Sequence, residues 1–284
     1  MGVIPIDITF SIIPYIRNKL NTVLSNIFKD YKIISILSEN IVDEIVDNDL
    51  ILFTLLELKN KDEYTYRHSV SVATFSLAIG ISINLTIKDL KELFIGALLH
   101  DIGKLFIPSS ILLKKGSLTK EEFEIMKGHP RKGYNYLILK NLGISNKALR
   151  ICLEHHERID GTGYPNNLKE NEIGILSKIV SIADVYDALT SNRSYRAPLS
   201  AAEALDYIKL NINSTFDEIL SKIFSKLIKS NPKDKSLISI NPNILEIDPQ
   251  IHNTSLLRPT IKLINNSNSK LKYTAKFIKK FNVN

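Results

Sequence analysis

The sequence predicts an all-α fold for most of the chain, followed by a small C-terminal extension that contains β-strands. Apolar residues recur three and four positions apart over long segments, which is typical of amphipathic helices. Thr86 or Asp89, followed by Glu92, is a helix N-cap signal. Residues 231–284 instead become rich in Asn, Pro and β-branched residues, which indicates a linker and short strands.

The expected elements divide the chain into three parts. Residues 1–50 form an N-terminal helical segment with an apolar stripe, and residues 51–230 form a compact helical domain. In that domain we expect one helix to begin near Thr86 and continue into the segment ending at Lys104, and another over residues 175–191. Residues 231–284 form the basic extension, with a strand in "LLRPTIKLI" and a helix near the end.

Composition and charge set the class of protein. The chain has 284 residues, of which 44% are apolar and 24% charged, an ordinary balance for a globular protein with a core. Residues 231–284 hold nine Lys/Arg and three Asp/Glu, a net charge of +6, which leaves +1 for the first 230 residues. The tail is expected either to contact an acidic partner or to be a solvated basic surface. No stable nucleic-acid partner is expected.

The sequence also predicts a cytoplasmic protein. A single cysteine, Cys152, excludes an intrachain disulfide framework and suits a reducing compartment. The apolar stretch "ITFSIIPYI" is too short to span a bilayer, so no transmembrane segment is expected. The N-terminus has Asp7 and no basic region, which argues against a signal peptide.

Three polar residues interrupt the apolar stripes. Asp101 continues the stripe of the helix that begins near Thr86, His68 shares a face with apolar residues, and Asp184 lies one turn after Val180. An unpaired buried charge is costly, so these side chains need partners. Five of the six histidines fall in this helical domain, which favours a metal site over separately satisfied core histidines. We expect His252, in the tail, to be an ordinary surface residue.

The spacing of these residues favours two metal ions. Neighbours on a helix point about 100° apart, so the pairs His100-Asp101 and His155-His156 suit two ions better than one. Seven candidate ligands are too many for a single ion, and Asp101 is the natural bridge between two. The candidate ligands are His68, His100, Asp101, His129, His155, His156 and Asp184.

Five motifs resemble those of the HD-GYP family, a branch of the HD phosphohydrolase superfamily, over about residues 50–225. They are "DEYTYRHS", "LLHDIGK", "KGHPRKG", "HHERIDGTGYP" and "IADVYDALTSNRSYR", in the order and spacing of that family. One His-Asp pair alone would carry little weight.

The resemblance implies an HD-type helical bundle that hydrolyses cyclic di-GMP to pGpG, GMP or both, by a hydroxide bound between two metals. It implies that His68, His100, Asp101 and Asp184 hold one divalent metal. Asp101 would bridge to a second, held by His129, His155 and His156. Tyr64 stands where some members carry a glutamate that recruits a third metal, which argues for two. The metals are expected to be iron or manganese.

The remaining site residues follow from the same motifs. Lys104 is expected to stabilise phosphate charge, and Arg193 and Arg196 are assigned to the second phosphate of the dinucleotide. Gly161 and Gly163 let the loop turn and approach a ligand, while Tyr164 stacks on a guanine or bonds a phosphate. Asp160 is expected to brace this loop or a histidine, and Asp187 to orient a ligand or cap locally.

Three alternatives stay open. The chain could be another HD phosphohydrolase, acting on a nucleoside triphosphate or an alarmone. Its substrate could be a hybrid cyclic dinucleotide or linear pGpG. It could also be a non-catalytic cyclic di-GMP sensor. The N-terminal helices are expected either to pack on the catalytic domain or to form a homodimer.

Overall fold

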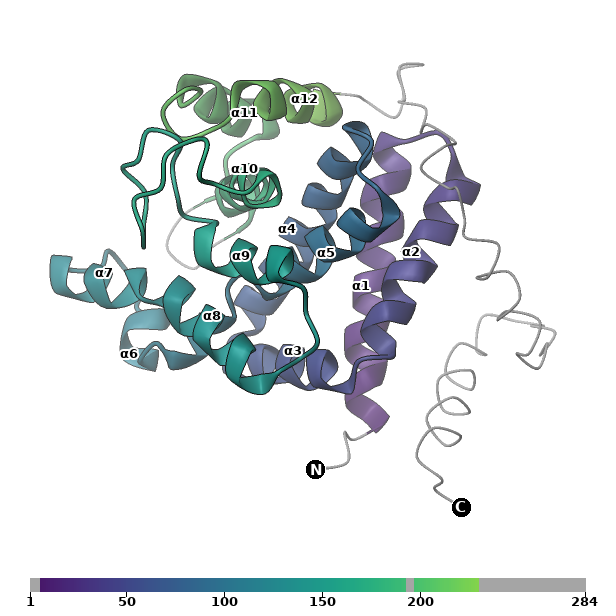
Figure 1. Cartoon of the computed structure of the whole chain (residues 1–284), viewed down its shortest axis with the longest axis horizontal. Helices are drawn as coiled ribbons and strands as arrows, with labels where there is room; N and C mark the ends of the chain where they lie inside the picture. Colours follow the sequence, from purple (N-terminus) through teal and green to yellow (C-terminus); the bar gives the residue numbers. More distant parts are fainter. Residues whose placement is uncertain (1–5, 193–196, 230–284) are drawn as a thin grey trace.

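This computed structural model describes residues 6–192 and 197–229, with residues 6–11 described by their backbone alone. Those residues form twelve α-helices and one 3-10 helix, and they contain two isolated β-bridges but no β-strand (Figure 1). The all-α prediction is confirmed for this part of the chain. The predicted β-containing extension, His252, Arg193 and Arg196 lie outside it.

Among the connections that the structure describes in full, the loop between α9 and α10 is the longest. The elements are α1 (Ile6–Ile27), α2 (Tyr31–Val46), α3 (Asp49–Lys61), α4 (Glu63–Ser82), α5 (Ile87–Leu99), η1 (Ile102–Phe106), α6 (Ser109–Leu112), α7 (Lys120–Lys127), α8 (His129–Lys140), α9 (Asn146–Glu154), α10 (Ile175–Thr190), α11 (Ala201–Leu210) and α12 (Glu218–Lys229).

Helix α4 is the centre of the bundle. It packs against α1, α3, α5, α10 and α12, and its residues from Ser69 to Ile81 are almost all buried. Small residues make this possible, because a helix surrounded on every side needs side chains that let its neighbours approach. At Gly80 an added Cβ would lie 2.8 Å from Leu90 of α5. The dense packing fixes the position of His68 on α4.

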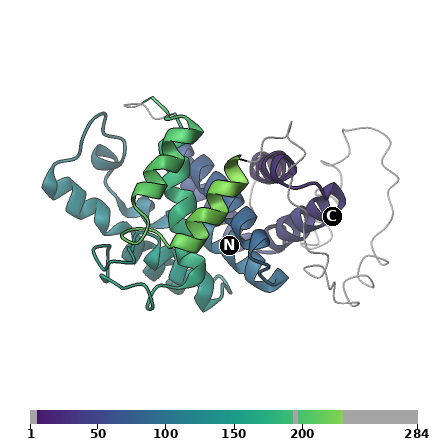
Figure 2. The same ribbon diagram turned by 90° about the horizontal axis from the view of Figure 1, so that it is seen from above.

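Helices α1 and α2 cover one side of the bundle (Figures 1 and 2). Their apolar residues belong to the same buried cluster as those of α4, α5 and α10. The Tyr66 hydroxyl of α4 donates to the carbonyl oxygen of Ile12 at 3.3 Å, and the Tyr15 and Tyr66 ring centroids are 5.7 Å apart. The N-terminal helices therefore share one core with the rest of the bundle.

The helix that begins at Thr86 is shorter than the sequence predicts. Of the two N-cap residues that the sequence indicated, Thr86 is the N-cap, and its hydroxyl accepts from the Asp89 N–H at 3.1 Å. The helix, however, ends at Leu99, and the 3-10 helix η1 follows. Gly103 explains the change, because an added Cβ there would lie 1.9 Å from the His129 carbonyl oxygen, so η1 is pressed against the start of α8. The second predicted helix, over 175–191, corresponds to α10.

Within residues 6–192 and 197–229, we find no helix that combines the length and the apolar character needed to cross a bilayer.

Candidate metal centre

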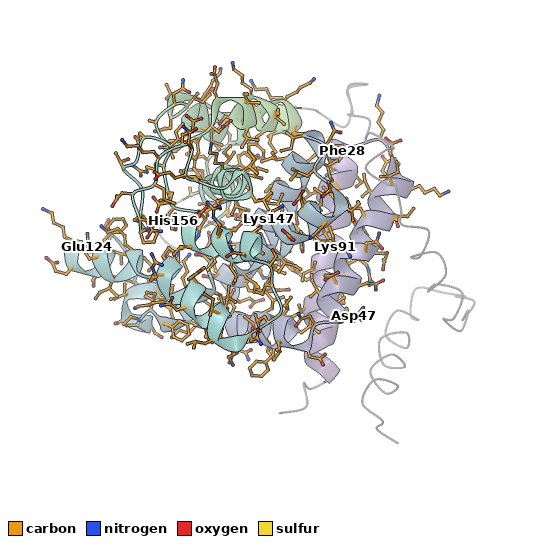
Figure 3. The ribbon with its side chains drawn as sticks, viewed as in Figure 1. Phe28, Asp47, Lys91, Glu124, Lys147 and His156 are labelled. Atoms are coloured by element: carbon orange, nitrogen blue, oxygen red, sulfur yellow. The ribbon has the colours of Figure 1, made fainter. Side chains whose placement is uncertain are left out.

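Seven candidate ligands come from five places in the bundle. His68 lies on α4, Asp184 on α10 and His129 at the start of α8, while His100 and Asp101 lie between α5 and η1. His155 and His156 follow the end of α9. Figure 3 shows His156 on the side of the molecule away from α1 and α2. Six of the seven residues are buried, and the His156 side chain is 26% exposed.

The side chains form two groups that share one carboxylate. In the first group, ligand atoms of Asp101, His129, His155 and His156 all lie within 4.8 Å of one another. In the second group, His68, His100 and Asp101 meet the same limit. Asp101 is common to both, so the structure brings the predicted bridging residue between the two sets of histidines.

Asp184 lies beside both groups. Its Oδ1 is 3.0 Å from His68 Nε2, and its Oδ2 is 3.9 Å from His156 Nδ1. Two carboxylates thus lie among five imidazoles, an oxygen and nitrogen donor set without thiolate that suits divalent iron, manganese or zinc.

Four of the histidines are oriented by a hydrogen bond at Nδ1. The Nδ1–H groups of His100, His129 and His155 donate to the carbonyl oxygens of Ala97, Met126 and Cys152, at 2.6, 2.8 and 3.0 Å. His68 Nδ1 donates to Asp187 Oδ2 at 2.7 Å. In His100, His129 and His155, a proton on Nδ1 leaves the Nε2 lone pair available, which is how proteins usually orient metal-binding imidazoles. Asp187 therefore orients a candidate ligand, as the sequence indicated.

The inward-facing atoms lack ordinary partners. His100 Nε2 and Asp101 Oδ1 are buried with no hydrogen-bond partner among the described residues. His129 Nε2 and His155 Nε2 lie 3.2 Å apart. Since both rings hold their proton on Nδ1, two lone pairs face each other there. Buried unpaired acceptors are costly, and a cation between them removes the cost. The residues present therefore fit divalent metal ions.

The carboxylates are ionised at neutral pH. Burial opposes ionisation of Asp101, but the Lys104 ammonium and His100 hold the pKa of that carboxyl well below its usual value. For Asp184, burial is likewise outweighed by the hydrogen bond from His68, and its pKa is lowered.

The imidazoles differ in their protonation. Burial, together with neighbouring His129, lowers the pKa of His156 to about 3, and burial also lowers that of His155. Both rings are therefore neutral, the form that binds metals. Burial lowers the pKa of His68 too, but hydrogen bonds to Asp184 and Asp187 outweigh it and raise that pKa to about 9.

The Lys104 ammonium is in direct contact with the carboxylate that the two groups share. Its Nζ forms an ion pair with Asp101 Oδ2 at 2.5 Å, and its side chain is 21% exposed. Lys104 lies on η1, a 3-10 helix that is wound more tightly than the α-helix expected from the sequence.

The glycine-rich loop after α9 brings Tyr164 to the centre. The Tyr164 and His156 ring centroids are 4.8 Å apart. Gly161 has φ 81°, a left-handed conformation that favours glycine. At Gly163 an added Cβ would lie 2.4 Å from the backbone nitrogen of Arg158, so the close approach that the structure shows there is to the chain itself. The Asp160 carboxylate accepts from the Thr162 N–H at 2.9 Å, so it braces the loop.

Two buried glutamates were not predicted from the sequence. Glu157 accepts from the backbone N–H groups of Asn166 and Leu168, and Glu154 accepts from the Gly174 N–H and the Ser177 hydroxyl. The only available signal was the unusual adjacency of two acids to the His155-His156 pair. These partners are 9 to 23 residues away in sequence, so no local pattern identifies them.

Comparisons with known proteins identify the family of this chain. The family model described as "HD domain" matches residues 54–220, more than half of the chain. The chain belongs to the HD domain family. The resemblance of its motifs to the HD-GYP branch is confirmed by the relatives that follow.

Two curated relatives are phosphodiesterases of cyclic dinucleotides. The chain is 37% identical over 238 residues to a Pseudomonas aeruginosa protein named cyclic di-GMP phosphodiesterase, which covers 82% of this chain and 57% of that protein. It is 36% identical over 157 residues to a Vibrio cholerae protein named 3'3'-cGAMP-specific phosphodiesterase 3, which covers 55% of this chain and 34% of that protein. The chain thus spans little more than half, or less, of these relatives.

A solved structure supports the fold. A protein described as an HDG"Y"P protein from Bdellovibrio bacteriovorus matches with a TM-score of 0.50 and 20% identity, over 78% of this chain and 81% of that one. At this identity the likeness concerns the helical architecture alone.

Proposed function

We propose that this chain is a metal-dependent phosphodiesterase that hydrolyses cyclic di-GMP to pGpG, GMP or both. The observation that carries the proposal is the pair of buried donor groups that share Asp101. The names of the relatives support the substrate class, since both act on cyclic dinucleotides. The catalytic unit would be residues 51–230, which contain every candidate ligand, with residues 1–50 as structural support.

In this proposal, the two donor groups hold two divalent metals, iron or manganese. His68, His100, Asp101 and Asp184 would form one site, and Asp101, His129, His155 and His156 the other. When bound, such metals neutralise phosphate charge and lower the pKa of a water molecule, which supplies the nucleophile at neutral pH.

The chain's own residues would orient the metal ligands and stabilise the charge of the substrate phosphate. The Nδ1 hydrogen bonds hold the rings of His100, His129 and His155 so that each Nε2 faces inward. Lys104 holds Asp101 in the resting site, and its partly exposed ammonium can reach a phosphate oxygen as negative charge grows there. The Tyr164 ring beside His156 offers a surface for a nucleobase or a donor for a phosphate. Arg193 and Arg196 would bind the second phosphate.

The test combines metal analysis with product analysis. The protein is purified anaerobically with iron or manganese, its metals are counted, and it is incubated with cyclic di-GMP, 3'3'-cGAMP or pGpG before chromatography. About two metals per chain with appearance of pGpG or GMP is the expected result. Faster turnover of 3'3'-cGAMP would identify the hybrid dinucleotide as the substrate. Bound metal and bound nucleotide without turnover would contradict the enzyme proposal and favour a sensor.

A substitution ties this activity to the shared carboxylate. Asp101→Asn removes one charge from both groups and is expected to lower metal content and abolish hydrolysis, while circular dichroism stays helical. Asp206→Asn, at an exposed position on α11, is the matched control and should change neither. Full metal content and full turnover in Asp101→Asn would contradict the proposed site.

A further inference from the structure

Glu157 is a buried carboxylate that lies outside both donor groups. It follows the His155-His156 pair directly, it is 2% exposed, and neither group of candidate metal ligands includes it. A buried carboxylate without partners is unfavourable, so its position needs a physical reason. The reason lies in the loop that leads to α10.

Both oxygens of Glu157 accept backbone hydrogen bonds from the far side of this loop. Oε1 accepts from the Asn166 N–H at 2.6 Å, and Oε2 accepts from the Leu168 N–H at 3.0 Å. Asn167, between them, has φ 56°, a left-handed conformation that asparagine tolerates better than most residues. Hydrogen bonds from N–H groups to an ionised carboxylate are stronger than those between neutral groups. The carboxylate therefore closes the loop into a ring of chain from residue 157 to residue 168.

Tyr164 lies inside that closed loop, on the side of the metal centre. Its N–H donates to the His156 carbonyl oxygen at 3.2 Å, and its ring centroid lies 4.8 Å from that of His156. Gly163 allows this close return, because any Cβ there would collide with the backbone of Glu157 and Arg158. A second connection, from Arg131 Nη2 on α8 to Asn166 Oδ1, measures 2.5 Å but is exposed. Of these two connections, the one made by Glu157 is the better shielded from water.

We propose that Glu157 is a positioning residue, whose carboxylate holds the loop so that Tyr164 stands against His156 and is presented to the dinucleotide. The inference rests on the proposed function for its substrate, but the loop geometry stands independently of it. Glu157 acts through Tyr164 and touches neither metal nor substrate. Its loss is therefore expected to alter substrate binding more than the chemical step.

The informative variant is Glu157→Gln. It keeps the size of the side chain but replaces one acceptor oxygen with an NH₂ donor, which then faces a backbone N–H. One charge-assisted hydrogen bond is lost, so we expect KM for cyclic di-GMP to rise by about ten-fold, with a smaller change in kcat. Metal content should stay that of the unsubstituted protein, because all candidate ligands remain.

A fluorescent reporter follows the loop without metal or substrate. The chain has no tryptophan, so Tyr164→Trp introduces a single indole at the position in question. Adding Glu157→Gln to this variant is expected to increase acrylamide quenching and shift the emission to longer wavelength. Glu154→Gln is the matched control, because Glu154 is also buried and also accepts a backbone N–H, but from Gly174 at the start of α10. It should leave the indole shielded.

The outcomes separate the loop from the function. Unchanged quenching with Glu157→Gln, or an equal change with Glu154→Gln, would overturn the role of Glu157 in the loop. Altered quenching with unchanged KM would overturn its role in substrate binding. Should Glu157→Gln fail to fold, amide hydrogen exchange of the unsubstituted protein decides instead: fast exchange at Asn166 and Leu168 would overturn the proposal, and protection would support it. Absence of turnover alongside the expected quenching would contradict the proposed function alone.

Discussion

Asp101 shows how a single residue connects the two halves of the centre. Its Oδ1 lies 3.2 Å from His129 Nε2, and its Oδ2 lies 3.2 Å from His100 Nε2 and 2.5 Å from Lys104 Nζ. A carboxylate with 2% of its side chain exposed keeps its charge because the charge of the Lys104 ammonium and the neighbouring His100 outweigh the cost of burial. At the residue scale, each candidate metal ligand therefore depends on a neighbouring group that holds its charge or its orientation.

The Asp187 carboxylate provides the test of that dependence. Its Oδ2 accepts from His68 Nδ1 at 2.7 Å and from the Ser191 hydroxyl at 3.1 Å. Asp187→Asn keeps the shape of the side chain but removes the negative charge that makes the His68 imidazole a stronger metal ligand. We expect metal affinity to fall roughly 10- to 100-fold, as for other carboxylates that support a metal-binding histidine. Titration against a competing chelator measures this, and Asp206→Asn on the surface serves as the control.

Equal metal affinity in Asp187→Asn and in the unsubstituted protein would show that the His68 ring is fixed by packing alone. His68 is a buried residue of α4, so packing of its neighbours also confines the ring.

The sequence indicated which side chains the structure brings together much better than it indicated the geometry of the elements that carry them. The His and Asp residues could be found because polar side chains on an apolar stripe are visible in one dimension. The acceptors for Nδ1 of His100, His129 and His155 are backbone carbonyl oxygens, which every residue has, so no pattern marks them. The 3-10 turn at η1 depends on the contact between Gly103 and α8, which local propensity does not encode.

At the element scale, α8 is tied to α3 by a tyrosine and a glutamate. The Tyr136 hydroxyl of α8 donates to Glu57 Oε2 of α3, and burial, together with Glu57, raises the pKa of Tyr136 above its usual 10.0. Because α8 also begins with His129, this contact helps to place a candidate ligand. Tyr136→Phe leaves Glu57 without its donor, and we expect the free energy of unfolding to fall by about 1–2 kcal/mol.

The same tyrosine gives a pH dependence with a definite sign. As the pH rises above 10.0, the unfolded chain releases the phenolic proton while the folded chain retains it. The contribution of Tyr136 to stability is therefore complete below that pH and is lost above it. Urea unfolding at pH 8 and pH 10.5 should show a smaller loss for Tyr136→Phe than for the unsubstituted protein. Tyr207→Phe, at an exposed position on α11, should behave like the unsubstituted protein, and identical losses in all three would contradict the assignment.

At the scale of the whole molecule, one apolar core extends across residue 50, where the sequence predicts the boundary between the N-terminal segment and the helical domain. Apolar residues of α1 and α2 belong to the buried cluster that also contains the inner faces of α4, α5 and α10. The family model begins at residue 54, so the helices that precede it lie outside the matched segment yet pack against it. Sequence patterns predicted these helices but not the helices that they contact, because an apolar stripe shows that a face is buried and does not show which element packs against it.

Truncation from either end distinguishes structural support from an independent module. Deleting residues 1–50 removes α1 and α2 and exposes the faces of α3, α4 and α5 that they cover. Each large apolar side chain returned to water costs about 1.5–3 kcal/mol, and a few together match the roughly 5–15 kcal/mol that stabilises a typical domain. We therefore expect this truncated chain to lose cooperative thermal unfolding and, with it, metal binding.

Deleting residues 231–284 is the comparison, because no candidate ligand lies in that segment. This truncation is expected to keep metal content and hydrolysis, and the loss of its net charge of +6 should lower retention on a cation-exchange column. Calorimetry, metal analysis and turnover on both truncated chains measure the difference. A folded and active chain without residues 1–50 would make the N-terminal helices a separate module, available to bind a second copy of the protein. A folded but inactive chain without residues 231–284 would instead place part of the site in the basic extension.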